Sequence, residues 1–145
     1  MKLEKFNNLK IKKGANYVIE YETEPSATRK AFEGRVKKCT TMVGRFGVKY
    51  ANMKANEGKE TGPMVWGEFK DDNNFIIEYN GKLYLRVTTS SLPNVRPKTI
   101  YLLDGEEITK ETLIEMGALG NRKPTEAPLV MNIKLENIIN IRCGD

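Results

Sequence analysis

The chain has 145 residues, with 24 Lys and Arg against 19 Asp and Glu, no histidine and a net charge of +5. This length fits one domain or two very small ones. The missing histidine excludes Ser-His-Asp and Cys-His catalysis and removes the commonest transition-metal ligand. Apolar residues make up 39% and charged residues 30% of the chain, which is typical of a globular protein with a packed core.

The two cysteines, Cys39 and Cys143, form no CxxC pair, so neither a zinc site nor a disulfide framework is indicated. Basic neighbours could lower the pKa of the Cys39 thiol, but without a histidine partner a catalytic role is not expected. The first residues carry charges throughout and lack the apolar run of a signal peptide. We therefore expect a cytoplasmic protein without a membrane span, metal or cofactor.

Positive charge is concentrated in the first part of the chain. Residues 1–54 hold 13 Lys and Arg against five acids, whereas residues 55–145 hold 11 against 14. The change coincides with the polar, glycine-containing segment 55–63. We predict a single compact domain over 1–145. The alternative is a basic β subdomain, 1–55, followed by a β subdomain with a helix insertion, 64–145.

Strand patterns begin at 17–23 and continue within 32–50, where Val, Thr, Phe and Tyr are frequent. Two alternating runs over 75–87 are joined by Asn80-Gly81, the pair favoured in a two-residue type I′ hairpin. A further strand over 98–103 meets a second tight-turn pair, Asp104-Gly105.

A short α-helix is expected near 109–116, with Thr109 as its N-cap and Gly117 at its end. Its exposed face is acidic, and its buried residues (Leu113, Ile114 and Met116) indicate packing against a sheet. The final apolar run, 129–141, predicts a closing strand interrupted by one tight turn. Together these elements predict a mainly β protein, a small SH3-like or OB-like barrel with one helix. A weak similarity between 48–53 and 133–138 leaves open two degenerate copies of a smaller barrel.

Basic residues are densest between Arg29 and Lys54, where eight of them accompany one acid, Glu33. In one strand register the core-facing positions are Val36, Met42, Phe46, Val48 and Tyr50, and the opposite face carries Arg35, Lys37, Arg45 and Lys49. A linear array of cations suits a phosphate backbone. The alternative is a lysine-rich edge strand whose charges only discourage edge-to-edge pairing.

The hairpin offers a second candidate surface. Its register places Tyr79 opposite Lys82, Ile77 opposite Tyr84, and Phe75 opposite Arg86. One face then mixes aromatic and cationic side chains, the combination that single-strand binders use. The alternative is that these aromatics only cover a neighbouring sheet.

No active site is indicated, because the adjacent acids Asp71-Asp72 and Glu106-Glu107 lie in predicted turns and no glycine loop has a phosphate-binding context. The first hypothesis is a non-catalytic nucleic-acid-binding module for single-stranded DNA or RNA. Its candidate site residues are Arg35, Lys37, Arg45, Phe46, Lys49, Tyr50, Tyr84 and Arg86. The alternative is a small protein-interaction module or inhibitor, of the phage accessory or defence-antagonist type, whose basic face meets an acidic protein surface.

Overall fold

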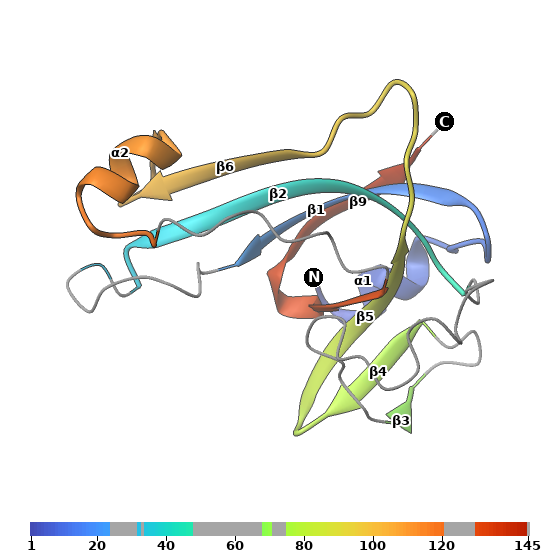
Figure 1. Ribbon diagram of the computed structural model, residues 1–145. Helices are drawn as coiled ribbons and strands as arrows, with labels where there is room; N and C mark the ends of the chain where they lie inside the picture. Colours follow the sequence, from blue (N-terminus) through green and yellow to red (C-terminus); the bar gives the residue numbers. More distant parts are fainter. Residues whose placement is uncertain (24–31, 33, 48–67, 71–74, 121–129, 145) are drawn as a thin grey trace, which may run out of the picture.

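The computed structural model describes residues 1–23, 32, 34–47, 68–70, 75–120 and 130–144. These residues form a mainly β fold built on one curled, half-barrel sheet, as predicted (Figure 1). The helices and strands in chain order are α1 (Leu3–Asn8), β1 (Asn16–Thr23), β2 (Val36–Arg45), β3 (Glu68–Phe69), β4 (Ile76–Tyr79), β5 (Lys82–Thr89), β6 (Lys98–Leu103), β7 (Glu106–Ile108), α2 (Lys110–Glu115), β8 (Val130–Lys134) and β9 (Ile138–Cys143).

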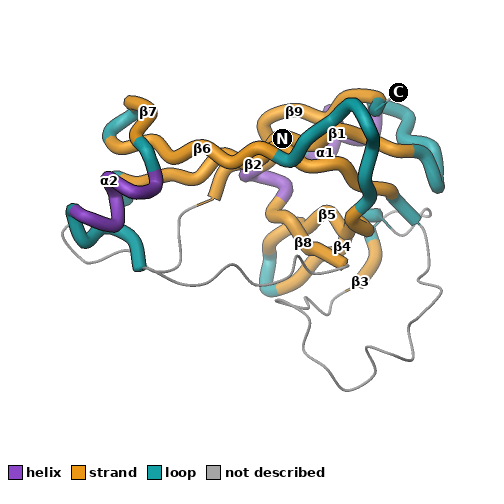
Figure 2. Tube along the Cα trace, turned by 45° about the horizontal axis from the view of Figure 1, so that its top comes forward, coloured by secondary structure: helices purple, strands orange, loops and turns teal. Residues whose placement is uncertain are grey.

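The order of neighbouring strands is β3-β4-β5-β2-β1-β9, with β6 and β7 attached to β2 and with β8 attached to β5. Residues 36–41 of β2 pair with β6, whereas Gly44 and Arg45 pair with β5. This change of partner along one long strand lets β6, β7 and α2 extend away from the curl, as Figure 2 shows. The candidate boundary at 55–63 lies outside the described residues, and the two strands that precede it, β1 and β2, lie between β5 and β9, which follow it.

The hairpin joins β4 and β5 in the expected register. Tyr79 pairs with Lys82 and Ile77 with Tyr84. Asn80 and Gly81 have φ of 50° and 76°, the left-handed conformation that a type I′ turn requires at both positions. The prediction for this segment is confirmed.

The closing run is interrupted where expected, by a short 3-10 helix over Leu135–Asn137 between β8 and β9. Its two halves do not pair with one another. Instead β8 pairs with β5 and β9 pairs with β1. The 3-10 helix therefore carries the chain from one side of the curl to the other.

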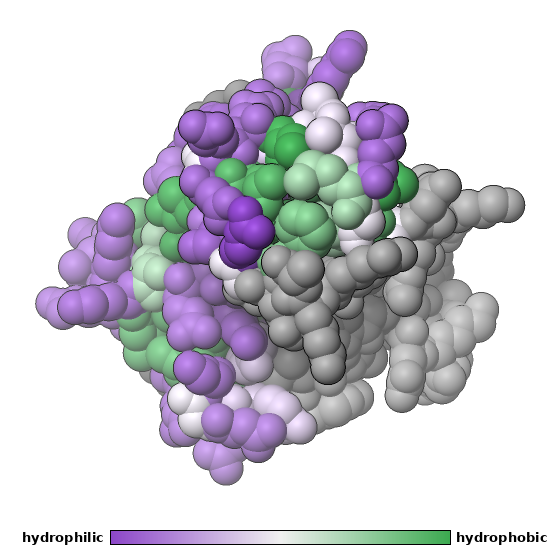
Figure 3. All heavy atoms as spheres, turned by 90° about the vertical axis from the view of Figure 1, so that its left-hand side faces the viewer, coloured by the Kyte–Doolittle hydropathy of each residue, from purple (hydrophilic) through white to green (hydrophobic). Residues whose placement is uncertain are grey.

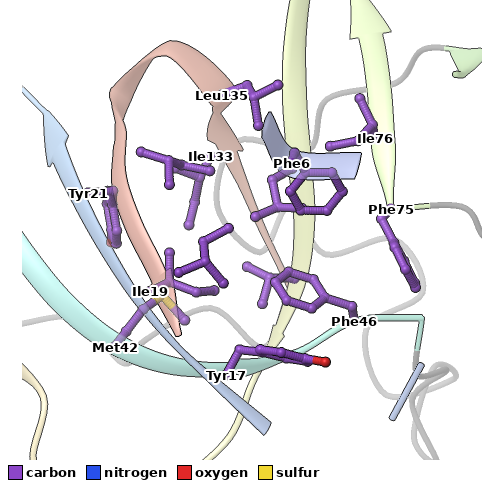
Figure 4. Close-up of a cluster of buried hydrophobic side chains, with 14 residues drawn as sticks. Phe6, Tyr17, Ile19, Tyr21, Met42, Phe46, Phe75, Ile76, Ile133 and Leu135 are labelled. Carbon is purple, nitrogen blue, oxygen red and sulfur yellow. The ribbon is translucent and has the colours of Figure 1, made fainter. Parts of the chain in front are cut away.

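The main core fills the inside of the curl, and three of its rings form a row (Figure 4). Phe46 lies between Tyr17 and Phe75, with ring centroids 5.2 Å and 5.7 Å apart. The N-terminal helix α1, which the sequence did not predict, packs its one buried residue, Phe6, edge-on against Phe46. Such a short helix depends on tertiary packing, because it is too short to be stable alone.

A second, smaller cluster lies where α2 covers the far end of β2. Thr109 caps the helix by accepting a hydrogen bond from the Thr112 N–H, and Gly117 ends it at φ 77°, as predicted. Leu113 and Ala118 are fully buried against Val36. Met116 is 44% exposed, so the expectation that it is buried was wrong. Figure 3 looks onto this end, where hydrophobic side chains are bordered by hydrophilic ones.

Candidate nucleic-acid interface

Arg35, at the start of the predicted basic stripe, is neutralised by Asp104. Its Nε and Nη2 lie 3.0 Å and 2.5 Å from the two carboxylate oxygens. Hydrogen bonding between them raises the pKa of the Arg35 guanidinium and lowers the pKa of the Asp104 carboxyl. Both side chains are exposed, but the pair presents little net charge to a phosphate.

Lys37 is also accompanied by an acid, because its Nζ lies 3.0 Å from Oε1 of Glu22. Glu22 lies on β1 opposite Cys39, and Glu20 lies opposite Thr41 on the same face. The outer face of the sheet, which points away from the main core, therefore carries both signs of charge at this end. This half of the stripe is a mixed surface and not a row of cations.

Arg45 lies at the other end of β2 and faces outward beside β5. Its neighbour Gly44 faces the core, where an added Cβ would lie 2.2 Å from Cγ2 of Val87. Arg45 pairs with Thr88, and Arg86 is two residues further along β5 on the same face. Diagonal neighbours of this kind have Cα atoms about 7–8 Å apart. The structure thus brings together two arginines that are 41 positions apart in the sequence.

Two of the groups that Arg86 contacts are neutral. Its guanidinium carbon lies 5.4 Å from the centre of the Phe69 ring, and its Nε lies 3.3 Å from Oδ1 of Asn132. Burial lowers the pKa of Arg86, but a guanidinium remains charged at neutral pH. Phe69 is 43% exposed despite this contact. The result is a fixed cation stacked on an accessible aromatic ring.

Tyr84 lies on the outer face of β5, two residues before Arg86. It forms a row with Ile77 of β4 and Phe69 of β3. It is half-buried. At the tip of the hairpin, Lys82 reaches Glu136 at 3.4 Å and is therefore partly neutralised. We call Arg45, Phe69, Tyr84 and Arg86 the outer-face cluster.

Phe46 must be removed from the candidate site. It has 0% exposed surface and lies in the aromatic row of the main core, so it cannot stack on a base (Figure 4). The alternation that placed it on the core side of β2 was correct, whereas its assignment as a base contact was wrong. Lys49 and Tyr50 lie outside the described residues.

Phe69 was not among the candidates, because β3 is only two residues long and has no alternation to place its side chains. The lysines before β1 were also missed, although their density was visible in the sequence.

The Cys39 thiol differs from the expectation of a lowered pKa. Its pKa is raised, first by burial and then by Glu22, while Lys37 acts in the opposite direction.

Comparisons of the chain with models of protein families, with curated proteins and with solved structures found no match. Within the described ranges, no three His, Cys, Asp or Glu side chains are grouped as metal ligands. Among the same residues, no helix has the length and apolar character needed to cross a membrane.

Proposed function

We propose that the protein is a non-catalytic module that binds single-stranded nucleic acid through the outer-face cluster. The observation that carries this proposal is the guanidinium of Arg86 stacked on the exposed ring of Phe69, with Arg45 on the same face. Proteins of this kind combine cations that track the backbone with aromatic rings on which bases stack. The outer-face cluster supplies both within a few residues.

The surroundings of Arg45 favour an anion. Arg45 donates from Nε to the neutral amide oxygen of Asn16 at 2.8 Å, which leaves its charge available. Arg86 is oriented by the Asn132 amide and the Phe69 ring. Side chains that are already ordered lose less conformational freedom on binding. The arginines are therefore prepared to contact phosphates while Phe69 and Tyr84 contact bases.

Both cysteines are thiols, which fits a protein that acts in a reducing cytoplasm.

The accessible aromatic side chains of the outer-face cluster support a single strand as the ligand. A base needs an accessible ring, and the bases of a duplex are stacked inside it, so a single strand suits the outer-face cluster better.

The test is fluorescence anisotropy with labelled single-stranded DNA, single-stranded RNA and duplex DNA over a salt series. Single strands should bind, with log K falling linearly against log salt. Arg45→Gln should reduce the magnitude of that slope by about 0.7, the value for one lost phosphate contact. Arg35→Gln, at the residue just before β2, is the matched control, because Asp104 already neutralises that arginine. Its slope should stay at the wild-type value.

Phe69→Ala tests the stacking. It should weaken binding by about 1–3 kcal/mol, the usual value for one base on one ring, with little change in the salt slope. No binding to single strands at about 50 mM salt, or equal slopes for the Arg45 and Arg35 variants, would reject the proposal. Binding to an acidic peptide in place of nucleic acid would favour an acidic protein partner.

A further inference from the structure

A groove of about 470 Å³ lies at one end of the sheet, between the segment that follows α1 and the last residues of β9. Its cationic lining residues are Lys10, Lys12 and Arg142, and its apolar lining includes Leu9, Ile11 and Ile141. No carboxylate lines it within the described part of the chain. In this respect the groove differs from the end of the sheet that carries Arg35 and Lys37, because each of these two cations has an acid beside it.

The groove is built by the fold. The backbone N–H of Lys12 donates to the hydroxyl oxygen of Tyr17 at 2.8 Å, which fixes the lysine-rich segment beside the start of β1. Tyr17 also lines the groove and is only 8% exposed. The hydroxyl oxygen of Tyr17 is the acceptor in that bond, so the bond does not use the hydroxyl proton.

The groove has the size and chemistry of a site for a small anion with an apolar part. Ligand pockets range from about 300 to 1,000 Å³. A phosphomonoester carries about −1.5 to −2 charges at pH 7, whereas a phosphodiester carries −1. A cluster of three cations favours the more highly charged group. The carbonyl dipole at the C-terminal end of α1, which borders the groove, opposes any anion and has to be outweighed by these cations.

Arg142 belongs both to the lining of the groove and to the edge strand β9. Arg142 pairs with Val18, which in turn pairs with Val43, so Arg142 lies on the same face as Arg45. The two arginines are two strands and two residues apart, which corresponds to about 12 Å between their Cα atoms. Between them lie Val18 and Val43, which are 0% and 3% exposed, so the two arginines share a face without forming one open surface.

We infer that this groove binds the phosphomonoester of a nucleotide. Lys10, Lys12 and Arg142 hold the phosphate, and the apolar wall at Leu9, Ile11 and Ile141 contacts the sugar or base. The nucleotide is either a free mononucleotide or the phosphorylated end of a bound strand. The second source rests on the proposed function, whereas the first does not.

The experiment compares oligonucleotides that carry a 5′-phosphate, a 3′-phosphate or no terminal phosphate, and titrates AMP and inorganic phosphate separately. A phosphorylated end should bind about tenfold more tightly than an unphosphorylated one, since a hydrogen bond to a charged group is worth about one such factor. The double variant Lys12→Gln/Arg142→Gln should lose this preference and also weaken AMP binding about tenfold or more. Its far-UV spectrum and melting temperature establish that it is folded.

The matched control is Lys110→Gln, on α2 at the opposite end of the sheet beside Glu107 and Glu111. It should keep the wild-type preference. If AMP binds but phosphorylated ends are not preferred, the assignment of the groove as a phosphomonoester site is supported. The free nucleotide is then its ligand. If AMP does not bind and all oligonucleotides bind equally, the groove assignment is overturned and the outer-face proposal stands. If AMP binds but no oligonucleotide does, only the outer-face proposal fails.

Discussion

Arg35 and Asp104 are bonded twice, through their side chains and through the Asp104 N–H, which donates to the carbonyl oxygen of Arg35 at 3.1 Å. Asp104 has φ of 51°, a left-handed conformation that Asp and Asn tolerate better than other residues with a side chain. This pair joins the start of β2 to the turn between β6 and β7. It also takes a cation out of the predicted phosphate-binding stripe.

Asp104→Asn should make the stability difference from wild type depend on pH. Asn keeps the left-handed turn but loses the charge. The pKa of Asp104 is lowered from 3.8 in the fold, so its contribution to stability is present above that value and is lost as pH falls through the lowered pKa. Urea unfolding at pH 6 should show a less stable variant, and the difference should shrink below about pH 4. A difference that persists at pH 2 would assign the effect to the turn and not to the ion pair.

Phe46→Leu should affect stability and leave binding unchanged. The substitution opens space in the aromatic row beside Tyr17 and Phe75, at a cost of about 1–3 kcal/mol in the free energy of unfolding. Because Phe46 has no exposed surface, the affinity of the folded variant for single-stranded DNA should match that of wild type. Weaker binding at a temperature where the variant is fully folded would contradict this placement.

Gly44→Ala should destabilise the fold by about 1–3 kcal/mol, because its Cβ would overlap Cγ2 of Val87. Val87→Ala removes the overlapping atom. In a double-mutant cycle measured by urea unfolding, the two changes should therefore couple favourably by about 1 kcal/mol or more. Val36→Ala, on the same strand but in the second cluster, is the control and should give an additive result. Additivity with Val87→Ala would show that the sheet relieves the overlap by moving elsewhere.

Alkylation should distinguish the two thiols. Burial raises the pKa of Cys39, which lowers its thiolate fraction, whereas Cys143 is exposed. With iodoacetamide at pH 8, peptide mass spectrometry should find Cys143 modified first. In Cys143→Ser, the remaining thiol should react more slowly in the native protein than in urea. Equal rates in the two conditions would show that the fold does not protect Cys39.

Local features of the fold could be predicted because neighbouring residues determine them. Asn80-Gly81 specifies a hairpin turn, since few other pairs accept two left-handed conformations in succession. Thr109 and Gly117 mark the ends of α2 for similar reasons of capping and backbone freedom. The helix α1 was missed, because its stability comes from burying Phe6 in a core that the local sequence does not show.

The candidate site was predicted less well, because charge and exposure depend on residues far away in the chain. The sequence placed Arg35 and Lys37 in a basic stripe. Asp104, in the turn between β6 and β7, and Glu22, on β1, neutralise them. The pairing of Arg45 with Thr88 decides that it shares a face with Arg86.

By itself the sequence determined that the protein is mainly β, where its hairpin turns, where its second helix begins and ends, and that its positive charge is concentrated before residue 55. Only the tertiary structure decided which cations stay accessible to an anion and that Phe46 is buried. It also decided that Lys10 and Lys12 meet Arg142 at one groove. Turns and periodicity are local properties of the backbone, whereas a surface is formed by strands whose partners are chosen through burial across the whole chain.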